Sequence, residues 1–287
     1  MSRDPAALEA LVTQRTRAAG SSFFWAMRFL EPTRRLAMYA VYAFCREIDD
    51  IVDEAGSDEE KIRRLDEWER DLALLYGGRE PRQDLAAALL PAIDRYALPV
   101  DDFIAVIAGC RMDVGAGVVR PSMEQLDLYC DRVAAAVGRL SVRVFGDFDA
   151  KHSIELANHQ GRALQLTNIL RDVAVDAEIG RLYLPDELLS KHGIDGTDIA
   201  AVLAHPNLPI ACAELAELAR YHFTQARAAL RHASRRAVRP AILMLEMYWR
   251  IWLQCRKLGW RPQSPVLGLP KRVKLWCALR YGLFAGV

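Results

Sequence analysis

The strongest constraint on the fold of this chain is a long run of helix-forming residues without glycine or proline. The run extends from Thr33 to Ala55, so it indicates one continuous helix. Residues spaced four, seven and eleven positions apart lie on the same face of a helix. One face is therefore predicted to carry a phenol, a guanidinium group and two carboxylates, contributed by Tyr42, Arg46, Asp49 and Asp53.

A second polar stripe occurs later, in a predicted helix over residues 150–177. Offsets of three, seven and eleven place two amides and two carboxylates on one face. Two aspartates one turn apart repel each other and destabilise a helix by about 0.2 to 0.5 kcal/mol. Each stripe therefore carries a cost that a bound cation would offset. The side chains of this second stripe are Gln165, Asn168, Asp172 and Asp176.

The ligand preference of Mg²⁺ gives these stripes a chemical meaning. Mg²⁺ prefers oxygen ligands, commonly one or two carboxylates together with water and phosphate oxygens. One Asp-x-x-x-Asp pair alone is more typical of a solvated acidic face. Two such pairs, each on an uninterrupted helix with amide or guanidinium groups, favour a metal site that faces a diphosphate. The predicted ligands are Asp49, Asp53, Asn168, Asp172 and Asp176.

Composition limits the class of protein. The chain has 287 residues, of which 52% are hydrophobic and 26% charged, which is enough apolar material for a globular core. The net charge of +1 gives no bulk electrostatic case for nucleic-acid binding. The sequence has no secretory leader pattern and no apolar run of about 18 residues. Six scattered cysteines without a Cys-x-x-Cys pair indicate free thiols in a reducing, cytoplasmic setting.

The pattern of helix signals predicts an all-α fold built as one domain over residues 1–287, with long helices around a central cavity. No strand pattern, short repeat or composition shift interrupts it. Asp4 and Pro5 are typical of a capped helix start, and Ser122 with Gln125 is typical of a capping box. Further helices are predicted over residues 23–30, 33–55, 58–76, 83–97, 101–115, 122–145, 150–177, 209–234 and 238–257.

Several other residues could serve chemistry or packing. Arg46 and Arg171 stand close to the aspartates, where each could form a salt bridge or bind a phosphate bidentately. Arg181 and Tyr183 follow the second stripe and could close over the same anion. No Glu-x-x-His pair, Gly-x-Gly-x-x-Gly run or P-loop is present, which argues against di-iron redox chemistry and nucleotide binding.

Three ordered motifs resemble those of the squalene/phytoene synthase family. Residues 42–53 resemble the first aspartate-rich motif, 129–138 the central motif that begins Tyr-Cys, and 165–176 with 180–185 the second aspartate-rich motif. The likeness covers most of the chain. Segments 21–28 and 274–281 are most similar to presqualene diphosphate synthases of bacterial hopanoid pathways. Members often have an acidic residue where this chain has Val175, which predicts a slightly less negative pocket.

The resemblance implies an isoprenoid-synthase-type helical bundle that condenses two farnesyl diphosphates head to head. The products would be presqualene diphosphate and pyrophosphate, with two or three Mg²⁺ ions and without NADPH. The family pattern implies catalytic roles for Tyr129, Tyr42, Asp49, Asp53, Asp172 and Asp176. It implies substrate binding by Ser22, Phe23, Arg46, Gln165, Asn168, Arg171, Arg181 and Tyr183.

Three alternatives stay open at this point. A phytoene or dehydrosqualene synthase of a carotenoid pathway would share the scaffold, because the sequence does not give the donor chain length. A non-catalytic assembly protein would predict eroded aspartates, whereas all four are intact. Residues 270–287 could be either a packed last helix or an amphipathic segment on the inner face of the membrane. Downstream enzymes of hopanoid synthesis are the predicted protein partners.

Overall fold

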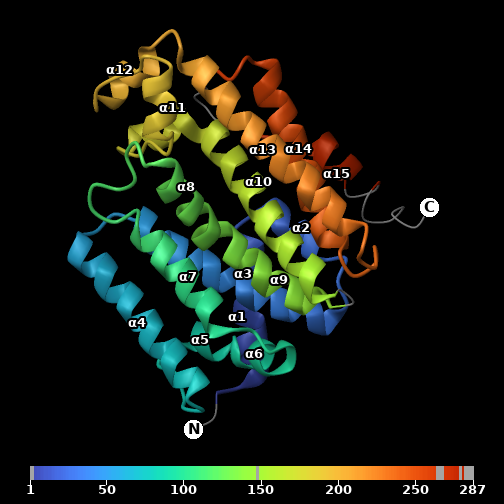
Figure 1. Ribbon diagram of the computed structural model, residues 1–287. Helices are drawn as coiled ribbons and strands as arrows, with labels where there is room; N and C mark the ends of the chain where they lie inside the picture. The colour runs from blue at the N-terminus through green and yellow to red at the C-terminus, as the bar shows by residue number, and fades with distance from the viewer. Residues whose placement is uncertain (1–2, 147–148, 263–267, 278–279, 281–287) are drawn as a thin grey trace.

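The computed structural model describes residues 3–146, 149–262, 268–277 and 280, and only the backbone at positions 22, 271, 274 and 275. Within these ranges the regular structure is helical, apart from an isolated bridge between Val119 and Leu182. One continuous hydrophobic core joins the helices, so the prediction of a single all-α domain is confirmed (Figure 1). The helices are α1 (Pro5–Ala18), α2 (Ser22–Met27), α3 (Pro32–Asp53), α4 (Asp58–Tyr76), α5 (Asp84–Ala87), α6 (Leu90–Tyr96), α7 (Val100–Arg111), α8 (Met123–Cys130), the π-helix η1 (Asp131–Ala135), α9 (Ala136–Phe145), α10 (Ala150–Glu178), α11 (Asp186–Lys191), α12 (Ile199–Ala204), α13 (Leu208–Leu230), α14 (Arg239–Lys257) and α15 (Lys271–Cys277).

The predicted helix starts are confirmed where a side chain caps the first turn. The Asp4 carboxylate accepts a hydrogen bond from the Ala6 N–H, and Pro5 opens α1. Ser122 and Gln125 form the capping box of α8, each side chain accepting from the other's backbone N–H. These local bonds satisfy N–H groups that have no partner inside the helix. They fix where a helix begins before any tertiary contact is formed.

Other boundaries differ from the prediction. The single helix predicted over residues 83–97 is two short helices, α5 and α6, because Pro91 lies in the first turn of α6 and supplies no N–H. The helix predicted over residues 122–145 changes register in its middle, where η1 separates α8 from α9. Helices α11 and α12 were not predicted, since each spans six residues and is too short for a clear periodic pattern.

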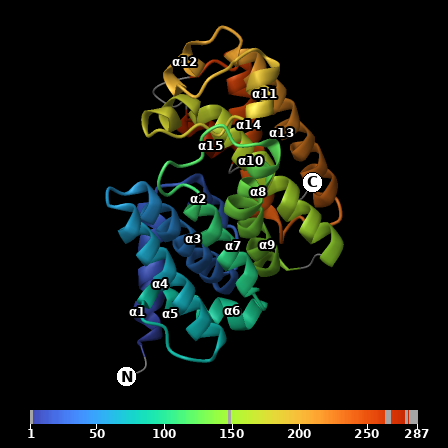
Figure 2. The ribbon, with the colours of Figure 1, turned by 60° about the vertical axis from the view of Figure 1, so that its left-hand side comes forward.

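Two long helices, α3 and α10, organise the domain. Helix α10 packs against α9, η1, α13 and α14, while α3 packs against α1, α7 and α9; Figures 1 and 2 show α10 running through the middle of the bundle. Behind α3, the buried ring of Phe44 meets Trp68 of α4 and Phe103 of α7 edge to face, with centroids 5.2 and 5.1 Å away. Such pairs are favourable beyond their buried area. These contacts orient α3 so that its polar stripe lies on the side opposite Phe44.

Helix α10 approaches η1 so closely that only glycine fits at the crossing. A Cβ added at Gly161 would lie 2.5 Å from the backbone nitrogen of Ala135 and 2.7 Å from the carbonyl carbon of Ala134. Real Cβ atoms essentially never come within 3.0 Å of another heavy atom. Single π-turns inside helices often mark functional sites, and here the π-turn packs directly on the helix that carries the second stripe.

The C-terminal helix α15 packs against α14. Its Cys277 is fully buried, and the Arg250 guanidinium of α14 lies 4.4 Å from the ring centroid of Trp276. The predicted packing of a last helix is thus observed for this part. Positions 278–279 and 281–287 of the predicted amphipathic segment lie outside the described residues. Among the helices that the structure describes, none is long and apolar enough to cross a membrane.

Candidate active site

A cavity of about 670 Å³ lies between α2, α3, α9, α10 and α14. Its lining changes from apolar to acidic along both long helices. On α3 the lining runs from Met38 to Asp53, and on α10 it runs from Leu156 to Asp176. At about 1.5 Å per helical residue, each stretch exceeds 20 Å. The predicted central cavity is therefore present, with an apolar end and an acidic end.

The structure brings together nearly all of the predicted site residues around this one cavity. Ser22 is the exception, because its side chain lies outside the described residues; the neighbouring Ser21 lines the cavity instead. The predicted residues that line it are Phe23, Tyr42, Arg46, Asp49, Asp53, Tyr129, Gln165, Asn168, Arg171, Asp172, Asp176, Arg181 and Tyr183.

Arg181 joins the two carboxylate stripes at the acidic end. Its Nη1 atom lies 2.8 Å from Oδ1 of Asp53 on α3, while its backbone N–H donates to the carbonyl of Asp176 on α10 over 2.9 Å. Gly180, with a φ of +79°, makes the left-handed turn that brings Arg181 back over the end of α10. The acidic ends of α3 and α10 therefore meet.

The carboxylates at this end are crowded. Burial and the nearby Asp53 raise the pKa of Asp49 from 3.8 to about 6. Burial and Asp172 raise the pKa of Asp176 to about 7. Half of the Asp49 side-chain surface remains accessible, because it faces the cavity. Together the two helices concentrate more negative charge here than the nearby guanidinium groups offset.

The two predicted arginines beside the aspartates form ion pairs. Arg171 binds Asp172 with two parallel bonds, Nε to Oδ1 over 2.7 Å and Nη2 to Oδ2 over 2.5 Å. Arg46 divides its charge between Asp49 at 3.2 Å and Asp50 at 2.6 Å. The salt-bridge interpretation is therefore correct for both arginines. Both guanidinium groups also line the cavity, where they can reach an anion.

A buried acid that the sequence did not single out connects two of the predicted tyrosines. Asp113 accepts hydrogen bonds from the hydroxyl of Tyr129 over 2.9 Å and from that of Tyr183 over 2.7 Å. The two rings stack with centroids 4.9 Å apart. Burial raises the pKa of both phenols well above 10, so both are neutral. Nε of Arg181 lies 4.0 Å from Asp113 and links this trio to the acidic end.

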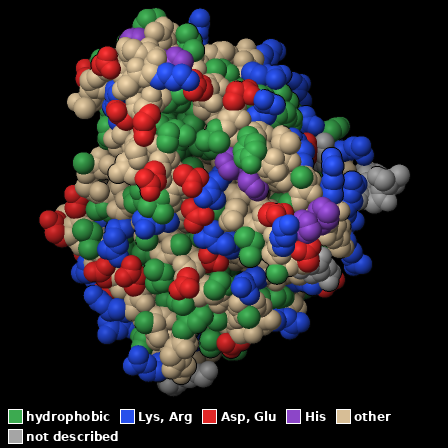
Figure 3. Space-filling model, in the orientation of Figure 1, with side chains coloured by type: hydrophobic (Ala, Val, Ile, Leu, Met, Phe, Trp, Pro, Cys, Tyr) green, Lys and Arg blue, Asp and Glu red, His purple; other side chains and the backbone are tan. Residues whose placement is uncertain are grey.

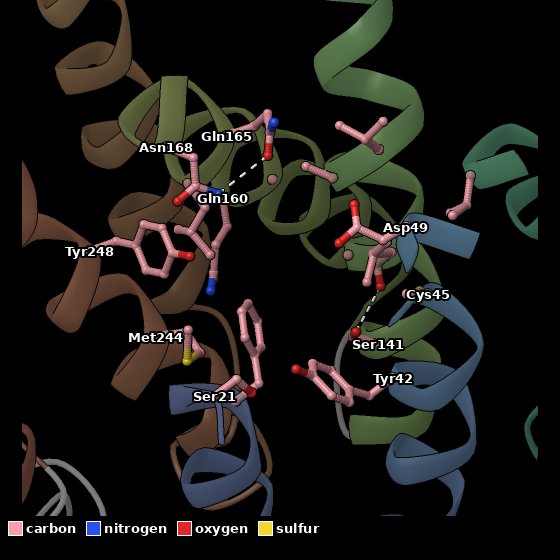
Figure 4. A pocket seen from close by; sticks show the side chains of 18 of the residues that line it. Ser21, Tyr42, Cys45, Asp49, Ser141, Gln160, Gln165, Asn168, Met244 and Tyr248 are labelled. Carbon is pink, nitrogen blue, oxygen red and sulfur yellow. Dashed lines mark hydrogen bonds between the residues drawn. The ribbon is translucent and has the colours of Figure 1, made fainter. Parts of the chain in front are cut away.

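On the opposite wall, α10 and α14 supply uncharged polar groups, as Figure 4 shows. Nδ2 of Asn168 lies 3.4 Å from Oε1 of Gln165, and the Asn168 Oδ1 atom is buried without a hydrogen-bond donor. Tyr248, which sequence reasoning missed, faces them from α14. Across the cavity, the rings of Phe23 and Tyr42 lie 5.9 Å apart and join α2 to α3.

Comparison with known proteins gives this geometry a family context. The family model for squalene/phytoene synthase matches residues 16–275. The chain belongs to the squalene/phytoene synthase family. A presqualene diphosphate synthase from Rhodopseudomonas palustris is 46% identical over 93% of this chain and 94% of its own length. A presqualene diphosphate synthase from Zymomonas mobilis is 45% identical over 92% of this chain and 89% of its own length.

Solved structures of the family share the fold. Squalene synthase HpnC from Alicyclobacillus acidocaldarius superposes with a TM-score of 0.82 at 27% identity, covering 90% of this chain and 97% of that one. The predicted isoprenoid-synthase-type helical bundle is therefore confirmed. Plant and cyanobacterial phytoene synthases also match, at 32% to 38% identity. All are more distant from this chain than the two presqualene diphosphate synthases.

Members of the squalene/phytoene synthase family generally depend on a divalent metal to ionise a diphosphate, and the residues present fit such an ion. Among the described residues, no three Asp, Glu, His or Cys side chains close around one point. Mg²⁺ does not require that, since it is commonly held by one or two carboxylates, water and substrate phosphate oxygens. The unsatisfied Oδ1 of Asn168 and the crowded Asp49 and Asp176 supply hard oxygen donors and excess negative charge.

Proposed function

We propose that this protein joins two farnesyl diphosphates head to head to form presqualene diphosphate and pyrophosphate in hopanoid biosynthesis. The observation that carries the proposal is that one cavity is acidic where α3 and α10 meet and apolar at its other end. Such a cavity suits a substrate with a diphosphate head and a hydrocarbon chain. The presqualene diphosphate synthases at 45% and 46% identity support the same reaction.

The acidic end would bind the diphosphates through Mg²⁺. Its ligands would be Asp49, Asp53, Asn168, Asp172 and Asp176, with two or three ions in all. Bound Mg²⁺ would supply electrophilic catalysis by neutralising the charge that builds up on the departing pyrophosphate. In the structure, three of these aspartates pair with arginines: Asp49 with Arg46, Asp172 with Arg171 and Asp53 with Arg181. These pairs limit their mutual repulsion until substrate arrives.

The three arginines would then bind phosphate oxygens. A guanidinium group presents its donors as a rigid fork that matches an oxyanion bidentately. Arg171 already uses this fork on Asp172, so an incoming diphosphate would share or take over those bonds. Arg181 lies between Asp53 and Asp113, where it would steady the released pyrophosphate. Gln165 and Tyr183 would complete the polar contacts of the substrate.

The apolar end would protect the allylic cation that ionisation leaves behind. Water must be excluded from such a cation, and Met38, Phe145 and Leu156 are among the side chains that line this end. The faces of Phe23 and Tyr42 would stabilise the positive charge through their ring quadrupoles. Helix α2, which carries Phe23, also carries Ser22, and we propose Ser22 as a further substrate contact.

Tyr129 would position the reacting groups or handle a proton. Its hydroxyl is neutral and donates to Asp113, so the phenol oxygen keeps lone-pair capacity toward the cavity. Stacking against Tyr183 fixes the ring. This role does not require a reductant, and we propose that NADPH is not used. A cytoplasmic enzyme at the inner face of the membrane, working with downstream hopanoid enzymes, completes the proposal.

A pyrophosphate-release assay with farnesyl diphosphate tests this function. Release is expected with Mg²⁺ and should stop when EDTA removes the metal. The variant Asp53→Asn should lose activity, whereas its exposed neighbour variant Glu54→Gln should keep it, because Glu54 pairs with Arg64 away from the cavity. Equal rates of the two variants would contradict the metal assignment. A carotenoid-type enzyme would instead release dehydrosqualene from this substrate, or would prefer geranylgeranyl diphosphate.

A further inference from the structure

The near-zero net charge of this chain conceals a strong asymmetry. Residues 218–287 contain 14 of the 38 Lys and Arg residues but only one of the 37 Asp and Glu residues, Glu246. The remainder of the chain is correspondingly acidic. Charge asymmetry between parts of a chain is typical of contact with a polyanion or an anionic membrane. The question is where the fold places the basic part.

The link between α13 and α14 carries the densest group of these charges. Arg231, Arg235 and Arg236 are exposed there, and Arg272 is exposed on α15. Figure 3 shows Lys and Arg side chains gathered along the right-hand edge of the molecule, the side on which Figure 1 labels α13, α14 and α15. Arg236 lies 3.8 Å from Glu31, which connects this link to the turn that follows α2.

Helix α2 continues the basic surface. Arg28 is exposed on its C-terminal side, and Arg17 is exposed at the end of α1. Burial raises the pKa of Tyr39, and the charges of Arg35, Arg28 and Arg17 oppose that rise. The three guanidinium groups therefore lie on the same side of the molecule as Tyr39. We call the surface formed by Arg17, Arg28, Arg231, Arg235, Arg236 and Arg272 the basic face.

The acidic groups beside the basic face already have cationic or imidazole partners. Glu31 faces Arg236 at 3.8 Å, and Glu246 binds Arg227 at 3.1 Å. Asp149 binds the imidazole of His152. Within the described part of the chain, Arg236 is the one member of the basic face that forms an ion pair. The face is thus complementary to an anionic surface.

Two exposed tryptophans accompany the basic face. Trp25 of α2 is 53% exposed, with the Arg28 guanidinium 5.3 Å from its ring centroid. Trp276 of α15 is 46% exposed and packs on Arg250. Both helices pack against α14. Tryptophan and arginine together are characteristic of the interface between membrane and water.

The inner side of the same elements lines the apolar end of the cavity. Ala26 and Met27 of α2 face the cavity while Trp25 faces outward, and Pro240 and Ala241 begin α14 at the cavity wall. The exposed indole and the cavity-lining residues therefore lie next to each other in the chain, on different sides of α2. This continuity favours a lipid partner over nucleic acid, for which an adjoining apolar cavity has no use.

We propose that the basic face, with Trp25 and Trp276, docks this protein onto an anionic lipid bilayer. The docked orientation places the apolar end of the cavity next to the membrane and leaves the acidic end toward water. The proposal deepens the proposed function and rests on it for its purpose, since the hydrocarbon part of the product would otherwise have to cross water. The docking itself can be measured without any substrate.

Sedimentation with phosphatidylcholine vesicles, with and without phosphatidylglycerol, tests the proposal at low ionic strength. Each basic residue near an anionic surface contributes about 1 kcal/mol of binding, so Arg235→Glu with Arg236→Glu should lower the partition coefficient at least about tenfold. The matched control is Arg70→Glu with Arg79→Glu, which reverses two exposed charges on and just after α4. The control should bind as the wild type does. Pyrophosphate release from soluble substrate should be the same in both variants.

A second variant, Trp25→Ala, separates lipid insertion from simple charge attraction. It should weaken binding to phosphatidylglycerol vesicles even at raised salt, where screening removes most of the electrostatic part. No binding of the wild type to anionic vesicles, or equal losses in test and control pairs, would overturn the proposal. Tighter binding to a DNA duplex than to the vesicles would also overturn it and assign the face to nucleic acid. Failure of vesicle binding with intact pyrophosphate release would leave the proposed function standing.

Discussion

Substitution of Gly161 by alanine probes the contact that fits α10 to η1. The added Cβ would lie 2.5 to 2.7 Å from backbone atoms of Ala134 and Ala135, so two helices must move apart. Overpacking of this kind costs about 1 to 3 kcal/mol, and the upper end applies because backbone cannot rotate away. Alanine recovers about 1 kcal/mol in helix propensity. The net expectation is a loss of about 1 to 2 kcal/mol of unfolding free energy.

Thermal unfolding followed by circular dichroism measures this effect. In a chain of this size, such a loss lowers Tm by roughly 2 to 8 °C. The control is Gly56→Ala, because no heavy atom lies within 4 Å of a Cβ added there and its φ is not positive; its Tm should change little or rise. An unchanged or higher Tm for Gly161→Ala would refute the close-approach argument. Turnover should also fall, since η1 lines the cavity through Val133 and Ala134.

Three further predictions follow from the acidic end. Because the folded-state pKa values of Asp49 and Asp176 are raised to about 6 and about 7, the folded protein holds extra protons. For the metal-free protein, the unfolding free energy should therefore fall as the pH rises from 4 to 7. An unfolding free energy that rises over this range would contradict the raised pKa values of the two aspartates. Asp176→Asn should lower turnover at least about a hundredfold with unchanged circular dichroism; near-normal turnover would remove it from the site. Tyr183→Phe should cost about 1.5 to 3 kcal/mol of stability, because Asp113 loses one hydrogen bond to a charged group, and urea unfolding that matches the wild type would show that this bond contributes nothing.

Much of the site could be predicted because it follows the helical period. Asp49 and Asp53 repeat at one turn, as do Asp172 and Asp176, so their shared faces are a local property of the chain. Their meeting at one cavity end is not local. It depends on how α3 packs relative to α10. It also depends on the ion pair between Arg181 and Asp53, two residues that are far apart in the sequence. The resemblance to a known family supplied that step.

Asp113 shows what the sequence could not supply. It lies in the turn after α7, where no periodic pattern relates it to Tyr129 or Tyr183. Only the fold brings those two hydroxyls to one carboxylate. Tyr248 was missed for a related reason, because α14 alternates apolar and aromatic residues on several faces and its cavity side is not evident from the sequence. Tertiary packing decides both positions.

Product analysis tests the central claim most directly. Purified protein would be incubated with Mg²⁺ and farnesyl diphosphate, with and without NADPH, and the lipid products identified by chromatography and mass spectrometry. The account predicts presqualene diphosphate under both conditions. Squalene that appears only with NADPH would contradict the absence of a reductive step. Dehydrosqualene would assign the chain to carotenoid synthesis, and no consumption of farnesyl diphosphate or geranylgeranyl diphosphate would contradict the enzymatic account altogether.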